Sequence, residues 1–197
     1  MRAFNIRTSM NKTTPDRRKT RLTDGRIILR PYDKNDAKAL YAAIRLSLKE
    51  VGAWLPFAHP GYAFSESREW LKKGPENWKK GIAYNFAIID AATAEQIGGC
   101  GINDIGEMNC RANLGYWVRS DKTGQGIAPS AARLLAKWGF EALGLKRIEI
   151  VVAVDNARSL RVAEKAGAKK EGILRNRLDI HGKIHDAVMH SLVPGEV

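Results

Sequence analysis

The spacing of apolar residues predicts alternating strands and helices from residue 26 onward. Alternating or continuous apolar runs predict strands, which we expect at residues 27–30, 84–89, 96–102, 113–118, 147–154, 172–180 and 183–193. Apolar residues at helical spacing predict helices beginning at Asp33, Ser65, Gly126 and Asn156, the second of them interrupted at Gly74–Pro75. This pattern predicts an α/β (α+β) fold with about seven strands and about four helices.

The clearest change of pattern lies between residues 114 and 138. Apolar residues alternate from Leu114 to Val118, and from Ala128 to Trp138 they recur at helical spacing. Gly124-Gln-Gly126 lies between the two, where glycines let the backbone approach a ligand and the first helical N–H groups have no partner inside the helix. With the positive end of the helix dipole, this turn predicts a site for a pyrophosphate or similar anion. A tight turn without a ligand is the alternative that a lone G-x-G favours.

The order of these segments resembles the GNAT acetyltransferases over roughly residues 25–193. The residues that carry the resemblance are Gly115-Tyr-Trp-Val118, Gly124-Gln-Gly-Ile-Ala128, Ala132, Phe140, Leu143-Gly-Leu-Lys-Arg-Ile148, Asn156-Ala-Arg-Ser159, Glu164-Lys-Ala-Gly-Ala168 and Glu171-Gly172. Within the family, the chain looks most similar to the RimJ/RimL branch, which acetylates protein N-termini. The resemblance implies a mixed central sheet in which the strands ending near Val118 and Val154 run parallel and splay apart, with acetyl-CoA in the gap.

The resemblance also implies which residues hold the cofactor and act on it. The cofactor-binding residues are expected to be Trp117, Val118, Arg119, Gly124, Gln125, Gly126, Ile127, Ala128, Asn156 and Ser159. The backbone N–H of Val118 is expected to donate to the oxyanion, and the Ser159 hydroxyl to the departing sulfur. Asn156 and Ser159 are also well suited to cap a helix, and the two roles can hold at once.

Three positions depart from the family's pattern. Thr123 replaces its Gln or Arg, Ala128 replaces its last glycine, and Asn113 stands where many relatives carry a glutamate. The anion site survives the first two changes because it works through backbone N–H groups. The third removes the usual carboxylate, and the remaining candidates for a general base are Asp104, Glu171 and Asp179.

The loop Trp54-Leu-Pro-Phe57 carries apolar side chains that full exposure would leave without partners. The RimJ/RimL branch has a similar segment beside its acceptor cleft. Trp54 and Phe57 are therefore predicted to form the acceptor wall, the alternative being that they cap the core.

The predicted activity is transfer of acetyl from acetyl-CoA to the N-terminal α-amine of a protein, ribosomal proteins being the leading class. An α-amine has a pKa of about 8 against about 10.4 for lysine, so it needs less help in losing its proton. One alternative is a small-amine acetyltransferase for aminoglycosides or polyamines, although acidic residues are scattered in the helices before Trp78. A second alternative is a non-catalytic CoA-binding or RNA-associated protein.

The charge distribution adds a basic tail to this picture. The chain of 197 residues has 33 Lys and Arg against 21 Asp and Glu, a net charge of +12. Residues 1–24 are predicted to be a basic, flexible tail and residues 25–197 a single acetyltransferase domain. The tail predicts either a weak RNA contact or a solvated leader without function.

The sequence predicts that the protein has no disulfide framework, no metal site and no membrane-spanning segment. Cys100 and Cys110 do not form a disulfide framework, and His181 and His185 lie across a turn, so no metal site is expected. Apolar runs are too short to span a membrane and no secretory signal is evident, so a cytoplasmic protein is expected. Both a monomer and a homodimer remain open.

Overall fold

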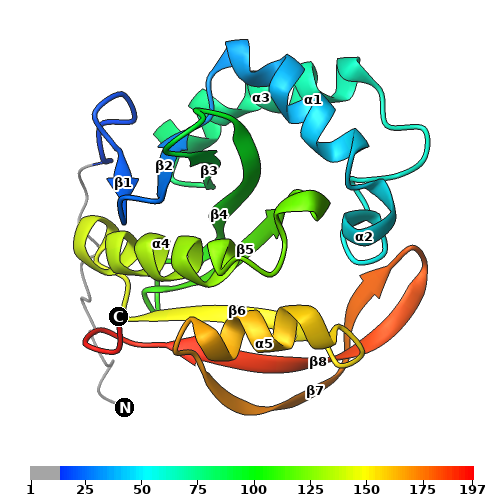
Figure 1. Cartoon of the computed structure of the whole chain (residues 1–197). Helices are drawn as coiled ribbons and strands as arrows, with labels where there is room; N and C mark the ends of the chain where they lie inside the picture. Colours follow the sequence, from blue (N-terminus) through cyan, green and yellow to red (C-terminus); the bar gives the residue numbers. More distant parts are fainter. Residues whose placement is uncertain (1–13) are drawn as a thin grey trace, which may run out of the picture.

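A single mixed sheet organises the computed structural model, which describes residues 14–197 (Figure 1). The strand order is β1-β2-β3-β4-β5-β6-β8-β7, and among these strands only β5 and β6 pair in parallel. The strands are β1 (Leu22–Thr23), β2 (Ile27–Pro31), β3 (Tyr84–Asp90), β4 (Gln96–Gly106), β5 (Arg111–Val118), β6 (Arg147–Ala153), β7 (Lys169–Ile180) and β8 (Lys183–Leu192). The predicted mixed α/β sheet is confirmed, with β1 as an additional strand.

Five α-helices cover the sheet. They are α1 (Ala37–Arg45), α2 (Leu48–Gly52), α3 (Phe64–Lys79), α4 (Ile127–Leu143) and α5 (Ala157–Lys165). Figure 1 shows α1 and α3 side by side, while α4 crosses the sheet on the other side of β4. Alternation along β3 explains the two layers, because Phe86 and Ile88 pack with the α4 core while Ala87 and Ile89 pack with the α1 core.

The prediction for the helix at Ser65 is wrong in two respects. It begins at Phe64, where a carboxylate oxygen of Glu66 accepts the N–H of Ala63 at 2.8 Å, so Ser65 is not the cap. It also continues through Pro75 instead of breaking there. Leu71 and Trp78 are both buried on its inner side and Pro75 is exposed, so packing on either side of the proline holds the helix together.

The predicted basic tail reaches into the described part of the chain. Leu22–Thr23 pairs with β2 as β1, and the indole N–H of Trp78 donates to the carbonyl of Pro15 at 2.8 Å. The guanidinium of Arg17 donates to the carbonyl of Tyr32. The ordered domain therefore starts before the predicted boundary at residue 25, and residues 1–13 of the predicted tail lie outside the described residues.

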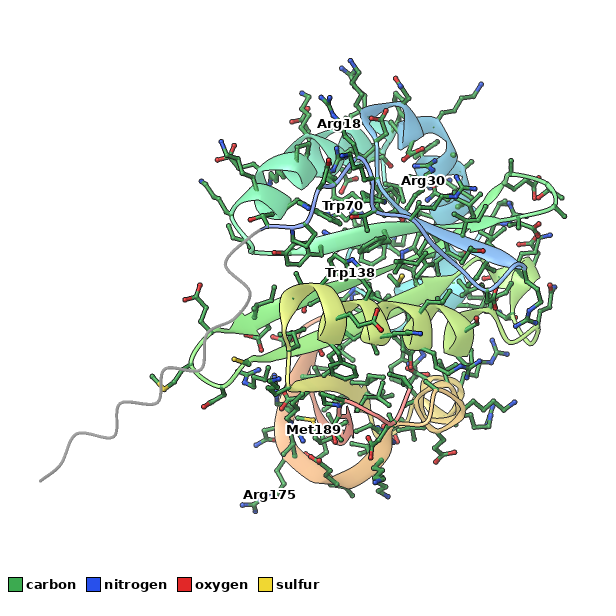
Figure 2. All side chains as sticks on the ribbon, turned by 90° about the vertical axis from the view of Figure 1, so that its left-hand side faces the viewer. Arg18, Arg30, Trp70, Trp138, Arg175 and Met189 are labelled. Atoms are coloured by element: carbon green, nitrogen blue, oxygen red, sulfur yellow. The ribbon has the colours of Figure 1, made fainter. Side chains whose placement is uncertain are left out.

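Trp138 of α4, labelled in Figure 2, packs against three aromatic rings from α3 and β3. The Trp138 ring centroid lies 5.7 Å from Trp78 of α3, 5.3 Å from Tyr84 and 5.2 Å from Phe86 of β3. Ring pairs at such separations add to the stabilisation that burial provides. Within residues 14–197, no helix combines the length and apolar character needed to cross a membrane.

We expect Trp138→Ala to lower the free energy of unfolding by roughly 3–5 kcal/mol, because it leaves a large cavity where the aromatic rings meet. Urea denaturation would measure the loss, with Lys137→Ala at the exposed neighbouring position as the control. A loss below about 1 kcal/mol would show that α4 does not depend on this cluster.

Candidate active site

A cleft opens between β5 and β6 because their parallel pairing stops early. The partners run from Arg111 with Arg147 to Asn113 with Glu149. β5 continues to Val118 and β6 to Ala153 without further pairs between them, and residues of both strands line a cleft of about 720 Å³. The strands therefore separate as the resemblance to the GNAT acetyltransferases implies.

The backbone N–H of Val118 on β5 points toward this cleft. On the other side of β5, the N–H of Arg119 donates to the carbonyl of Ile97 at 2.8 Å. Successive amides of a strand point in opposite directions, so the N–H of Val118 points away from β4 and into the gap. Its predicted role as the oxyanion donor requires this orientation, and the role itself stays a prediction.

A basic hollow of about 380 Å³ lies at the start of α4. Gly124 and Gly126 have φ values of 79° and 76°, which favour glycine, and no side chain caps the helix at Gly126. The cationic side chains that line the hollow are Lys122, Arg158, Arg161 and Lys165, and no acidic side chain is among its described lining residues. Free helix amides surrounded by positive charge fit a pyrophosphate or similar anion.

The cleft and the basic hollow bring most of the predicted cofactor residues together. Their lining includes Trp117, Val118, Gly124, Gly126, Ile127, Ala128, Asn156 and Ser159. Arg119 and Gln125 line neither of them. The Arg119 side chain is only 13% exposed, and its guanidinium donates to Asp121 at 2.7 Å and to Glu95 at 3.2 Å, so two carboxylates already hold it.

Two hydroxyls line the cleft, that of Ser159 near the start of α5 and that of Tyr116 on β5. The Asn156 side chain accepts the N–H of Ser159 at 3.1 Å, which confirms helix capping for Asn156. The Tyr116 hydroxyl on β5 lies 3.1 Å from the Ser159 hydroxyl and also donates to the Ser159 carbonyl at 3.1 Å. Burial raises the pKa of Tyr116 to about 12, so this phenol stays protonated near neutral pH and can donate. Tyr116 was not among the predicted site residues, although period-two spacing put it on the face of Val118.

A second cavity, of about 470 Å³, meets the cleft at β5. Both are lined by Leu55, Gly115, Tyr116 and Trp117. We call it the acceptor cavity, and its aromatic lining consists of Tyr32, Phe57, Tyr62, Trp70, Tyr116 and Trp117. Phe57 lines this cavity, with its ring 6.3 Å from that of Trp117, whereas Trp54 lines the cleft and lies 6.4 Å from the ring of His185. The acceptor-wall role of both residues stays a prediction.

Glycines of β4 form the floor of the acceptor cavity. A Cβ at Gly99 would lie 2.4 Å from the hydroxyl of Tyr32 and 2.7 Å from the indole nitrogen of Trp117. A Cβ at Gly101 would lie 2.4 Å from the side-chain oxygen of Asn85. These polar groups can lie over the strand only because it has no side chains there.

The three carboxylates considered as a general base have other partners. Asp104 accepts from Arg111 at 3.1 Å, and Asp179 accepts the N–H of Gly182 at 2.8 Å. Hydrogen bonds from Arg147 and Ser191 lower the pKa of Glu171 to about 2. Of the three, only Asp179 lines the cleft. At the position of the missing glutamate, the Asn113 amide donates to Asn103 at 2.9 Å.

Comparison with known proteins identifies the family. Residues 26–169 match the acetyltransferase (GNAT) domain. The chain belongs to the GNAT acetyltransferase family. YdaF of Bacillus subtilis (strain 168), named as a candidate ribosomal N-acetyltransferase, is 31% identical over 173 residues, which cover 86% of this chain and 92% of YdaF.

Two further similar proteins bear on the reaction and on the cofactor. Spermidine N(1)-acetyltransferase of Escherichia coli (strain K12) is 27% identical over 160 residues, which cover 81% of this chain and 82% of that enzyme. Mycobacterium smegmatis RimJ, solved in complex with a CoA disulfide, matches with a TM-score of 0.80 at 25% identity, over 90% of this chain and 88% of RimJ. This GNAT protein is an acetyl-CoA-dependent N-acetyltransferase, so the alternative of a non-catalytic CoA-binding protein is not retained.

The residues present fit acetyl-CoA. When bound, the cofactor supplies a thioester carbonyl that an amine can attack and a thiolate that departs. The basic hollow can hold the pyrophosphate, and the unpaired edges of β5 and β6 can hold the pantetheine amides. The hydroxyls of Tyr116 and Ser159 are two donors in the cleft that could hydrogen-bond a developing thiolate.

We expect Ser159→Ala and Tyr116→Phe each to lower kcat by about tenfold to a hundredfold, because each removes one hydroxyl of this donor pair. The Kd of acetyl-CoA should change by less than about threefold, since the basic hollow and strand edges are intact. Steady-state kinetics would measure kcat, and calorimetry would measure the Kd of acetyl-CoA.

Tyr41→Phe is the control, because Tyr41 lines neither cavity. An unchanged kcat in both test variants would remove the hydroxyl pair from the mechanism.

The lowered pKa of Glu171 predicts an acid-dependent loss of stability. Its folded pKa of about 2 lies below the ordinary value of 4.5, so its contribution is present above about pH 4.5 and is lost as pH falls toward 2. From about pH 5 to about pH 3, the unfolding free energy of Glu171→Gln should therefore fall less than that of the unsubstituted protein. Urea titrations at each pH would measure this, and parallel pH profiles would contradict it.

Proposed function

We propose that this enzyme acetylates the N-terminal α-amine of a protein, with ribosomal proteins as the leading class. The observation that carries the proposal is the chemistry of the acceptor cavity. Its described lining includes six Tyr, Phe and Trp side chains and one carboxylate, Glu66. Such a lining suits an acceptor that brings one positive charge attached to an otherwise uncharged chain end.

The absence of a strand glutamate at Asn113 supports the same acceptor. An α-amine with a pKa of about 8 is partly neutral near pH 7, whereas a side-chain amine of about 10.4 needs a base to lose its proton. The Asn113 side chain is a neutral amide bonded to Asn103, so it cannot serve as that base. The name of YdaF supports a ribosomal substrate, and such a substrate would place the enzyme in the cytoplasm.

Acetylation of a small polyamine is the competing function, because the spermidine enzyme is among the relatives. A polyamine carries several positive charges, and its recognition favours several carboxylates. The single carboxylate among the described lining residues of the acceptor cavity favours the peptide. A weak RNA contact through residues 1–24 and the choice between monomer and homodimer stay predictions.

Mass spectrometry of reaction products would test the acceptor class. The purified enzyme is incubated with acetyl-CoA and Ser-, Ala- and Thr-starting peptides, polyamines and aminoglycosides. We expect acetylation at the peptide α-amine, and the same peptides with a blocked N-terminus but an internal lysine should stay unmodified because lysine keeps its proton. Acetylated spermidine or aminoglycoside without acetylated peptide would overturn the proposal.

A further inference from the structure

Glu66 and His59 form a pair at the rim of the acceptor cavity. A ring nitrogen of His59 lies 2.9 Å from one carboxylate oxygen of Glu66, and the other oxygen accepts the N–H of Ala63 at 2.8 Å. Both partners line the cavity and remain open to solvent, since the side chain of His59 is 40% exposed and that of Glu66 is 43% exposed. The carboxylate is thus held in place while part of it stays accessible to a ligand.

The carboxylate is ionised and lines a cavity that aromatic side chains also line. Hydrogen bonds from the Ala63 amide and from His59 lower the pKa of Glu66, so it carries a negative charge near neutral pH. Tyr62 and Trp70 line the same cavity, and the ring of Tyr62 lies 6.0 Å from that of His59. Aromatic faces attract cations, so the rings and the carboxylate favour the same kind of ligand.

The rest of the described lining offers no competing charge. It contains no Lys, Arg or Asp, and its other polar side chains are neutral hydroxyls, amides and a thiol. Glu69, one turn further along α3, accepts from Lys72 at 2.6 Å and does not line the cavity. Glu66 is therefore the charged group that a cationic acceptor meets on entering the described part of this cavity.

We infer that Glu66 is the specificity-determining residue that captures the ammonium form of the acceptor α-amine, and that His59 is the residue that positions its carboxylate. The inference rests on the proposed function for the identity of the amine. Capture occurs at the α3 side of the cavity, whereas Tyr116 and Trp117 on β5 border the cofactor cleft. Glu66 therefore contributes to acceptor binding and leaves the chemical step to the groups on β5.

A comparison of two ligands and two variants tests the charge contact. The ligands are a Ser-starting peptide and its desamino analogue, in which hydrogen replaces the α-amino group, and binding is measured by calorimetry with CoA present. The unsubstituted enzyme should bind the amine about tenfold more tightly, as expected for one charge-assisted contact. Glu66→Gln keeps the acceptor for Ala63 but loses the charge, so it should bind both ligands alike.

Kinetics separate capture from catalysis. Glu66→Gln should raise the KM for the peptide about tenfold with kcat changed by less than about twofold, and Glu69→Gln should match the unsubstituted enzyme. A fall in kcat at constant KM would overturn the inference by placing Glu66 in the chemical step. Retained discrimination between amine and desamino ligand in Glu66→Gln would overturn it as well.

The histidine's part has its own test. His59→Leu removes the hydrogen bond to Glu66 and should raise KM, whereas His59→Gln retains an N–H donor and should recover most of the affinity. Equal effects of the two variants would show that His59 does not act through this bond. If the enzyme acetylates only small amines, the proposed function fails, and the same comparison with that amine and its desamino analogue still decides the role of Glu66.

Discussion

The early end of the β5–β6 ladder is the constraint on which the site depends. A continuous parallel ladder would use every main-chain group along the facing edges, and no ligand could enter between them. Because pairing stops at Asn113 and Glu149, the following residues of both strands keep unpaired edges inside the fold. The starts of α4 and α5 border the same opening, so an extended anionic ligand finds amides, positive charge and hydroxyls along one path.

The features that the sequence predicted well are those determined by neighbouring residues. The turn at Gly124–Gly126 and the cap at Asn156 depend on contacts within a few positions, so residue type alone indicates them. The parallel strand β6 was also predicted, from its nearly continuous apolar run, although burial along it alternates between buried and half-buried residues. Propensity failed at Pro75, where the core contacts of Leu71 and Trp78 outweigh one lost hydrogen bond.

The features that could not be predicted arise where distant segments meet. Tyr116 and Ser159 are 43 positions apart, and their hydroxyl contact depends on how α5 packs beside β5. The predicted strand at 96–102 contains Gly99, but only the tertiary structure shows that Tyr32 and Trp117 lie over it. Arg119 shows the reverse case, because a predicted ligand side chain is held by carboxylates from its own turn and from before β4.

Tyr116 lines the acceptor cavity and the cofactor cleft at the same time, and its hydroxyl is bonded to the helix that borders the cleft. The acceptor cavity and the cofactor cleft thus share this side chain at the place where they meet. A cofactor that shifts this ring alters the space left for the acceptor, and an acceptor that presses on the ring alters the fit of the cofactor. Thermodynamic linkage requires the two effects to be equal in free energy, so any change that this ring transmits from the cofactor to the acceptor is transmitted equally in the other direction.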